Sequence, residues 1–225
     1  MKRSFYLAAA VAFVVGAIQA FGQPSVTYTF SGGTPDGWSN SGFGTAPPAT
    51  VVAFGGINYI NLPLGGFQVG NVGHGADGSD FYNAMQAAAA NPAGYQISYN
   101  YRIDTSTFVG ATFFQLGTFV NTGSGYYVQD FGAVKEVELN GTQIASGQVF
   151  SGTVTINMAA VGFLMPPADT FFRLGLIENA TSGSTGVSAS FTSISVSPVP
   201  EPASLCLLGL GASALWIMRR SSTRR

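Results

Sequence analysis

The chain has 225 residues, of which 46% are hydrophobic and 8% are charged, and its formal net charge is −1. Six of the nine basic residues lie near the two ends, so the body between them keeps only Arg102, Lys135 and Arg173. This acidic body lacks the basic patch that nucleic-acid binding requires. Because its only cysteine is Cys206 and its only histidine is His74, disulfides, thiol catalysis and a transition-metal site in the body are also excluded.

Residues 1–22 have the composition of a secretory signal peptide. Lys2 and Arg3 precede an apolar run, Phe5–Ile18, and small residues then allow a cut before Gln23 or after Ala20. The run is short for a permanent membrane span, although a retained anchor is the alternative. We therefore expect export through the secretion translocon and cleavage by signal peptidase.

Residues 24–198 are predicted to form one domain of short strands joined by Gly-rich turns. Tyr95–Asp104 alternates strictly between apolar and polar residues, and similar alternation occurs around Val154–Met158 and Phe172–Leu176. Phe108–Val120 is apolar nearly throughout, which is typical of a central strand. The other expected strands are Val26–Phe30, Thr50–Phe54, Ile57–Leu62, Phe67–Val72, Gly125–Phe131 and Val187–Val196.

Two local signals refine this pattern. Asn140-Gly141 predicts a type I′ hairpin that pairs Leu139 with Thr142. A shift in the apolar pattern after Phe191 predicts a β-bulge near Thr192-Ser193.

Only Ser79–Ala90 has the pattern of a helix, with Ser79 or Asp77 as its cap and Asn91-Pro92 as its stop. About ten strands and one short helix predict a mainly β fold, a single antiparallel β-sandwich. The body resembles jelly-roll carbohydrate-binding modules of the galactose-binding-like type at its two ends. The resemblance rests on Phe30 and Asp36-Gly37-Trp38 in the opening and on the closing strand before Pro200.

The sequence offers few residues for chemistry, and we expect no enzyme activity and no cofactor. A hydrolase would have to combine His74 with Asp77 or Asp80 and a serine, but no nucleophile-elbow motif is present. We expect His74 to lie in a polar surface loop. Asp77 and Asp80 are candidate calcium ligands, and a helix cap or plain turn is the alternative for them.

A sugar-binding site would use exposed aromatic rings. Trp38, Tyr126 and Tyr127 are the candidate carbohydrate contacts, because each lies among Gly, Ser, Asn, Gln or Asp residues, and Tyr82 is a fourth aromatic of this kind. A core position is the alternative for Trp38, and an inward-pointing ring is the alternative for one of the two adjacent tyrosines.

The last residues consist of Pro200-Glu201-Pro202, an uncharged run from Ala203 to Met218, and a tail that begins with Arg219 and Arg220. We expect this run to form a short transmembrane helix, which would span roughly 24 Å, somewhat less than the bilayer core of about 30 Å. Arginines after the run place this end in the cytoplasm and the body outside. An ordinary core helix is the alternative, but the run has no polar stripe.

This tail, residues 199–225, resembles the PEP-CTERM sorting signal, which is also described as the ice-binding-protein C-terminal motif. The resemblance implies a bacterial protein that an exosortase, a membrane transpeptidase-like protease, cuts near Pro200-Glu201-Pro202. It also implies an association with exopolysaccharide and biofilm matrix. We therefore expect an exported protein that is anchored in the inner membrane and then moves to the cell surface or matrix. A lectin-like module for exopolysaccharide is the alternative, followed by a glycan-active enzyme.

Overall fold

The structure is a computed structural model that describes residues 22–40, 49–64, 70–75, 79–106, 113–122, 126–128, 137–140, 148–161, 172–180 and 187–200. The chain divides into a body, Pro24–Ser197, and a second unit made of Met1–Gln23 and Pro198–Arg225. Only residues 22–23 and 198–200 of that second unit are described, so the fold below is that of the body.

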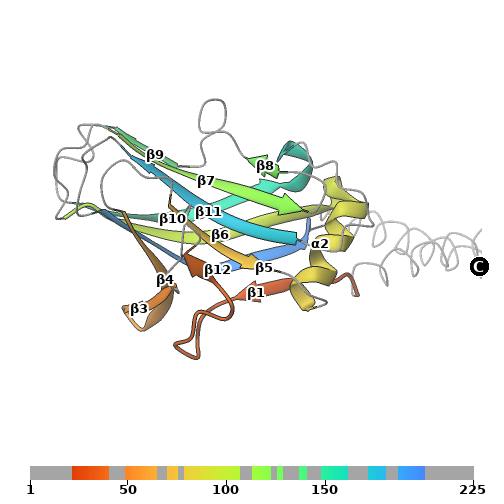
Figure 1. The fold of residues 1–225 in the computed structure, drawn as a ribbon, viewed down its shortest axis with the longest axis horizontal. Coiled ribbons are helices and arrows are strands. Elements are labelled where there is room, and N and C mark those ends of the chain that lie inside the picture. The colour runs from red at the N-terminus through yellow and green to blue at the C-terminus, as the bar shows by residue number, and fades with distance from the viewer. Residues whose placement is uncertain are drawn as a thin grey trace, which may run out of the picture. The chain divides into compact units, whose positions relative to one another are not determined.

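The body is a sandwich of two antiparallel six-stranded sheets (Figure 1). Sheet A has the order β10-β6-β12-β4-β3, and β1 pairs with β12. Sheet B has the order β2-β5-β11-β7-β8, and β9 pairs with β7. The strands of sheet A are β1 (Val26–Tyr28), β3 (Thr50–Phe54), β4 (Ile57–Leu64), β6 (Tyr95–Asp104), β10 (Val149–Asn157) and β12 (Val187–Pro198). The strands of sheet B are β2 (Ser39–Asn40), β5 (Gly70–Gly75), β7 (Phe113–Thr122), β8 (Tyr126–Val128), β9 (Val137–Asn140) and β11 (Phe172–Ala180).

The core lies between the sheets and is built by the predicted alternation. Along β6, Tyr95, Ile97, Tyr99 and Ile103 are buried, whereas Arg102 and the other even positions are partly exposed. The inner face of β11 contributes Phe172, Leu174 and Leu176 to the same core. Burial of such side chains stabilises a fold by roughly 1.5–3 kcal/mol each. The predicted sandwich of strands with one short helix is therefore confirmed.

Helix α2 (Asp80–Ala90) packs at one end of the sandwich, beside β1 (Figure 1). The Ser79 side chain caps it by accepting a hydrogen bond from the Tyr82 backbone N–H, as predicted. The buried side of α2 carries Phe81, Ala84, Met85, Ala88 and Ala89. Two short 3-10 turns, η1 (Pro92–Gly94) and η2 (Met158–Val161), complete the described elements.

The predicted bulge is confirmed in β12. Residues Val187–Phe191 pair with β4, and Ile194–Val196 pair with β1, so the partner changes at Thr192-Ser193. Ser193 has φ 52°, a left-handed conformation that allows the ladder to shift by one residue. Phe191 and Ile194 are consequently both buried, although they are three positions apart and would lie on opposite faces of a regular strand.

Strand β5 differs from the sequence-based prediction. Strand β5 is shifted toward the helix and includes His74, which pairs in register with Leu174 of β11. The prediction that His74 lies in a surface loop is therefore wrong, because pairing with β11 recruits a glycine-rich segment of low strand propensity. Strand β9 alternates as predicted, with Val137 and Leu139 buried. The turn at Asn140-Gly141 extends beyond the described residues and stays a prediction.

Candidate functional site

The sorting segment begins where the body ends. Strand β12 finishes at Pro198, and Val199 and Pro200 are the last described residues. Glu201, Pro202, the run Ala203–Met218, Arg219 and Arg220 lie outside the described residues. Within the described part of the chain, no helix has the length and apolar character needed to cross a membrane.

The first and last strands of the body are direct neighbours. Val26 pairs with Val196 and Thr27 with Ser195, so β1 begins beside the end of β12. The Tyr95 hydroxyl donates a 3.0 Å hydrogen bond to the Pro24 carbonyl, which fixes the chain just before β1. The two ends of the body, which lead to the two predicted processing sites, therefore lie side by side.

A groove of about 520 Å³ lies at this end, between the start of the body and the outer side of α2. We call it the α2 groove. Its lining consists of Pro24, Ser25, Asp80, Asn83, Gln86, Ala87 and Ala90. Asp80 is the one charged residue of this lining. Nearby, burial raises the pKa of Tyr28, and the carboxylates of Asp36 and Asp80 raise it further, which indicates a negative local potential.

The outer face of sheet A is polar and cross-linked by its own side chains. Three hydrogen bonds each join neighbouring strands of this face. They are Ser98 Oγ to Ser195 Oγ (2.8 Å), Thr153 Oγ1 to Asn100 Oδ1 (2.7 Å) and Ser190 Oγ to Asn61 Oδ1 (2.9 Å). These hydrogen bonds give partners to polar groups that are partly removed from water, so they stabilise the sheet.

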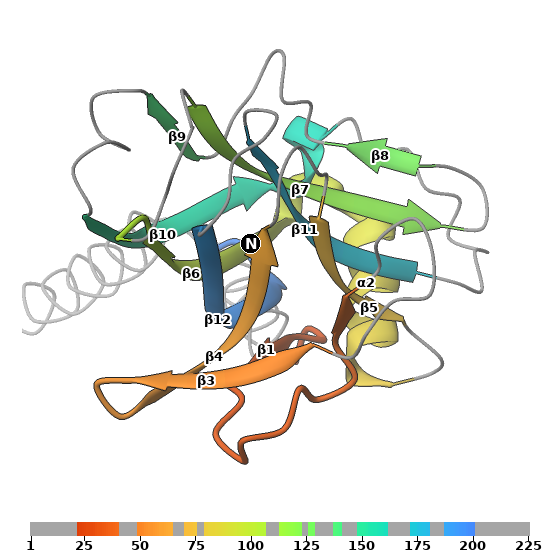
Figure 2. The same cartoon turned by 60° about the vertical axis from the view of Figure 1, so that its left-hand side comes forward.

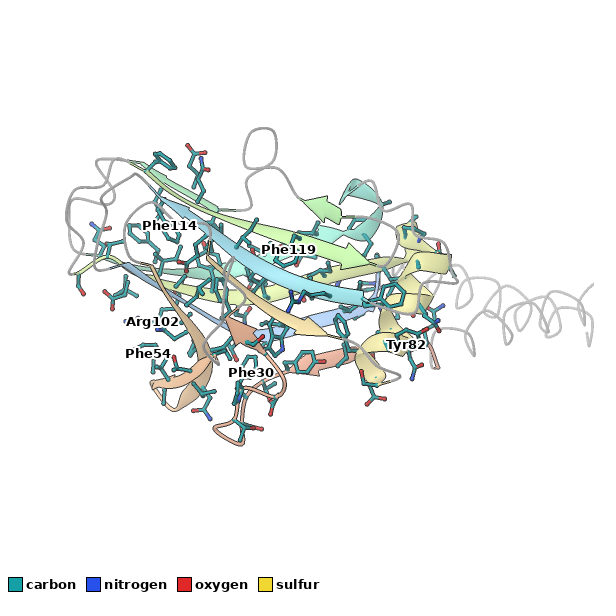
Figure 3. All side chains as sticks on the ribbon, in the orientation of Figure 1. Phe30, Phe54, Tyr82, Arg102, Phe114 and Phe119 are labelled. Carbon is teal, nitrogen blue, oxygen red and sulfur yellow. The ribbon has the colours of Figure 1, made fainter. Side chains whose placement is uncertain are left out.

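An aromatic and charged cluster lies on the same face, and Figure 3 shows Arg102 beside Phe54. The Arg102 guanidinium carbon is 3.9 Å from the centre of the Phe54 ring, and Tyr59 packs edge-on against Phe54 with centroids 5.8 Å apart. Asp104 holds Arg102 through a 3.1 Å ion pair. Hydrogen bonds from Ser106 lower the pKa of Asp104, and Arg102 lowers it further against the opposing effect of burial.

The β3–β4 hairpin positions this cluster (Figure 2). Phe54 pairs with Ile57 across Gly55-Gly56, whose φ values of 58° and 81° form a two-residue turn that suits glycine. Ile57 and Val149 are the large hydrophobic side chains that are more than half exposed among the described residues, at 52% and 51%. Ile57 pairs with Phe54, and Val149 pairs with Asp104, so Ile57 and Val149 flank the Phe54–Arg102 contact.

The outer face of sheet B is built differently. Gly175 of β11 pairs with Phe119 of β7, and the Phe119 ring lies directly over the glycine, where a Cβ atom would overlap Cε1 and Cζ of the ring. Phe119 and Ile177 are almost completely buried there, outside the main core. Arg173, two residues before Gly175, has a buried Nε atom with no hydrogen-bond partner among the described residues.

Glu178 is the most unusual polar residue of the interior. It lies on β11 opposite Leu116 and is completely buried, and neither carboxylate oxygen has a hydrogen-bond partner in the described structure. Burial raises the pKa of Glu178 well above its ordinary value. The Ala189 backbone N–H lowers this pKa in part, although it does not complete a hydrogen bond of good geometry.

Trp38 requires a correction. The structure places its ring in the core, 1% exposed, with the Tyr28 ring edge-on at 5.6 Å. Asp36 and Gly37 have φ values of 48° and 84°, and the Trp38 backbone N–H donates to Pro35, so a tight turn directs the chain back into the sandwich. An enclosed indole has no face for a sugar, and Trp38 is therefore a core residue.

The remaining predicted site residues are not brought together in the described structure. Tyr126 and Tyr127 lie in β8, in register with Asn121 and Val120, and their role as sugar contacts stays a prediction. Asp80 begins α2 and is exposed, whereas Asp77 lies outside the described residues, so the calcium prediction is also untested. The described residues contain no group of three or more His, Cys, Asp or Glu side chains placed to hold a metal.

Sequence reasoning did not identify the Phe54–Tyr59–Arg102 cluster. Two signals in the sequence pointed toward it. Gly55-Gly56 between two predicted strands indicates a hairpin, and Arg102 is one of only three basic residues in the body. The contact between them depends on the order of strands in sheet A, which local patterns do not contain.

Several carbohydrate-binding modules resemble the fold at low sequence identity. The crystal structure of a carbohydrate-binding module specific for non-crystalline cellulose, CBM28, is 13% identical, with a TM-score of 0.49, 74% of this chain covered and 91% of that chain. The CBM22-1 xylan-binding domain of Xyn10C from Paenibacillus barcinonensis is 8% identical, with a TM-score of 0.46 and coverages of 79% and 95%. TmCBM61 in complex with β-1,4-galactotriose is 13% identical, with a TM-score of 0.41 and coverages of 76% and 94%. At these scores the likeness carries no argument about a ligand.

No curated protein matches the sequence. The tail, in contrast, is matched by a family model that covers residues 198–225, within one residue of the predicted start of the signal. The resemblance noted from Pro200-Glu201-Pro202 onward is thereby confirmed. The chain carries a PEP-CTERM protein-sorting motif directly after the last strand of its β-sandwich.

Proposed function

We propose that this chain is an exported, non-enzymatic protein of the bacterial cell surface or extracellular matrix. Its tail anchors the β-sandwich in the inner membrane, with the body outside the cytoplasm, until an exosortase-like protease cuts near the sorting motif. The observation that carries this proposal is the match of residues 198–225 to the sorting motif. The signal-peptide pattern of residues 1–22 supports export by an independent sequence feature.

The anatomy of the tail supports a temporary anchor. Ala203–Met218 is short for a stable span, and Arg219 and Arg220 retain their end of the run at the cytoplasmic side. The composition of the body supports a non-catalytic role, because it has a single histidine, no cysteine and no nucleophile-elbow motif.

The test is fractionation of the native bacterium followed by terminal sequencing of the protein from each fraction. We expect a membrane-bound form that begins near Gln23 and a surface or matrix form that ends near Pro200-Glu201-Pro202. A protein that keeps both residues 1–22 and its arginine tail in every fraction would contradict the proposal.

A second candidate is a lectin-like module that binds the exopolysaccharide of the cell. The outer face of sheet A favours it, because the half-buried Phe54 and Tyr59 rings share this face with the partly exposed Asn61 amide, two residues after Tyr59 on β4. Aromatic rings of this kind pack on the apolar faces of sugars, and the neighbouring polar groups are suited to sugar hydroxyls.

Binding of the mature protein to purified exopolysaccharide and to a glycan array distinguishes the two candidates. A lectin-like protein should lose about tenfold in affinity when Tyr59 is changed to Ala, the equivalent of about 1.4 kcal/mol. The matched control is Thr155→Ala, an exposed position on β10 of the same face. Equal affinity of Tyr59→Ala and the control, or no binding at all, would remove this candidate.

A further inference from the structure

The segment that separates the folded body from the sorting motif is very short. Val196 is the last residue of β12 that pairs with β1, and Pro200 begins the motif only four positions later. A fully extended chain gains at most about 3.6 Å per residue, so these positions are separated by at most about 14 Å.

A protease that holds the motif in its active site must therefore contact the end of the sandwich. Even a domain of about 100 residues has a radius of gyration near 13 Å, and a peptide-binding cleft is recessed in the enzyme surface. Because the segment between the body and the motif is at most about 14 Å long, the enzyme cannot bind the motif without contacting the body. The contacted end is fixed by the register of β1 and β12, which places Pro24 and Ser25 beside the exit of the tail.

The α2 groove lies at that end and offers groups that can contact a polypeptide. Ala87 and Ala90 provide small apolar patches, and the amides of Asn83 and Gln86 can pair with backbone groups. The Gln86 amide nitrogen donates to the Tyr82 hydroxyl at 2.6 Å, which orients the side chain. Asp80, the one charged lining residue, favours a basic partner through charge complementarity.

We propose that the α2 groove is a docking site for the sorting protease and receives an extracytoplasmic loop of that enzyme that carries a basic side chain. The inference rests on the proposed processing of the tail. The protease would then recognise two features of its substrate, the motif at Pro200-Glu201-Pro202 and the end of the folded domain beside it. Only a folded body would present both, because α2, β1 and β12 are far apart in the sequence.

The first experiment measures the rate of tail processing by pulse-chase in the native bacterium. The double variant Asn83→Arg and Ala90→Arg fills the groove with positive charge at two exposed positions. Arginine is a good helix former, and a basic residue in the last turn suits the helix dipole, so α2 should remain folded. Ser151→Arg and Thr155→Arg on exposed β10 positions add the same charge elsewhere as a control.

We expect processing of the groove variant to be at least fivefold slower than that of the wild type, while the β10 control is unchanged. Equal rates for the groove variant and the control would overturn the proposal. Circular dichroism and thermal melting of both purified variants verify that the comparison is between folded proteins. Wild-type protein that is never processed would overturn the proposed function itself, together with this inference.

The second experiment inserts eight Gly and Ser residues between Val199 and Pro200. The enzyme then reaches the motif without contact with the body, so docking no longer assists cleavage. We expect the insertion alone to slow processing severalfold and to abolish the difference between Asn83→Arg/Ala90→Arg and the unsubstituted groove. An insertion variant that is processed as fast as the wild type would show that the α2 groove contributes nothing.

Discussion

On the outer face of sheet A, polar side chains hydrogen-bond to one another across neighbouring strands, as Ser98 does with Ser195. In sheet B, glycine and an aromatic ring replace such a pair at Gly175 and Phe119. Sheet B also contains Glu178, whose carboxylate oxygens are buried without partners in the described structure. The two sheets have the same number of strands but differ in their interactions. Sheet A is stabilised by paired polar groups, whereas sheet B combines close packing with a buried carboxyl group. The same substitution should therefore have very different costs in the two sheets.

The largest expected effect is that of an added methyl group in sheet B. Gly175→Ala places a Cβ atom where the enclosed Phe119 ring lies, and overpacking of this kind costs about 3 kcal/mol. The matched change in sheet A is Gly152→Ala, whose Cβ atom would meet the Tyr101 hydroxyl at 2.7 Å. Tyr101 is only half-buried and can swing aside, so we expect a cost below about 1 kcal/mol. Denaturant unfolding of both variants measures the difference, and similar midpoints would refute the comparison.

Removal of the buried carboxyl group should stabilise sheet B. Glu178→Leu replaces a desolvated acid by an apolar side chain of similar size, and we expect about 1–3 kcal/mol of added stability at pH 7. Because the folded-state pKa of Glu178 is raised, the wild type is most stable below the unfolded-state pKa of about 4.3. Its stability falls as pH rises from there toward the folded-state pKa.

The advantage of Glu178→Leu should therefore be small near pH 4 and grow with rising pH. Urea unfolding of the wild type and the variant at several pH values tests this sign. Glu138→Leu, a partly exposed position on neighbouring β9, is the control. An advantage that shrinks with rising pH would mean that the Glu178 carboxylate has a stabilising partner.

The smallest expected effect concerns the Arg102–Phe54 contact of sheet A. Stacking of a partly exposed guanidinium on a ring is worth about 0.5–1 kcal/mol, and the Asp104 ion pair adds little because it is partly solvated. A double-mutant cycle of Arg102→Ala and Phe54→Ala should give a coupling energy in this range. A coupling near zero would indicate that the cluster does not contribute to the stability of the face.

Much of the fold could be predicted from the sequence because the signals that specify it are local. Alternation in Tyr95–Asp104, the Ser79 cap of α2 and the register shift at Thr192-Ser193 depend on neighbours in the chain, and each is present in the structure. His74 was placed wrongly because its strand depends on a distant partner, β11, that supplies the hydrogen bonds of a glycine-rich segment. Trp38 was kept as a site candidate because composition does not reveal that a turn with positive φ angles buries the ring.

The sequence by itself determined the sorting motif, because that signal is a linear pattern of a tripeptide, an apolar run and arginines that needs no fold to be recognised. It also determined the sandwich class, because strand alternation is a local property. Only the tertiary structure decided that β1 lies beside β12, that the α2 groove adjoins the exit of the tail, and that Arg102 covers Phe54. Those contacts join residues far apart in the chain, and their positions follow from strand order, which local sequence does not encode.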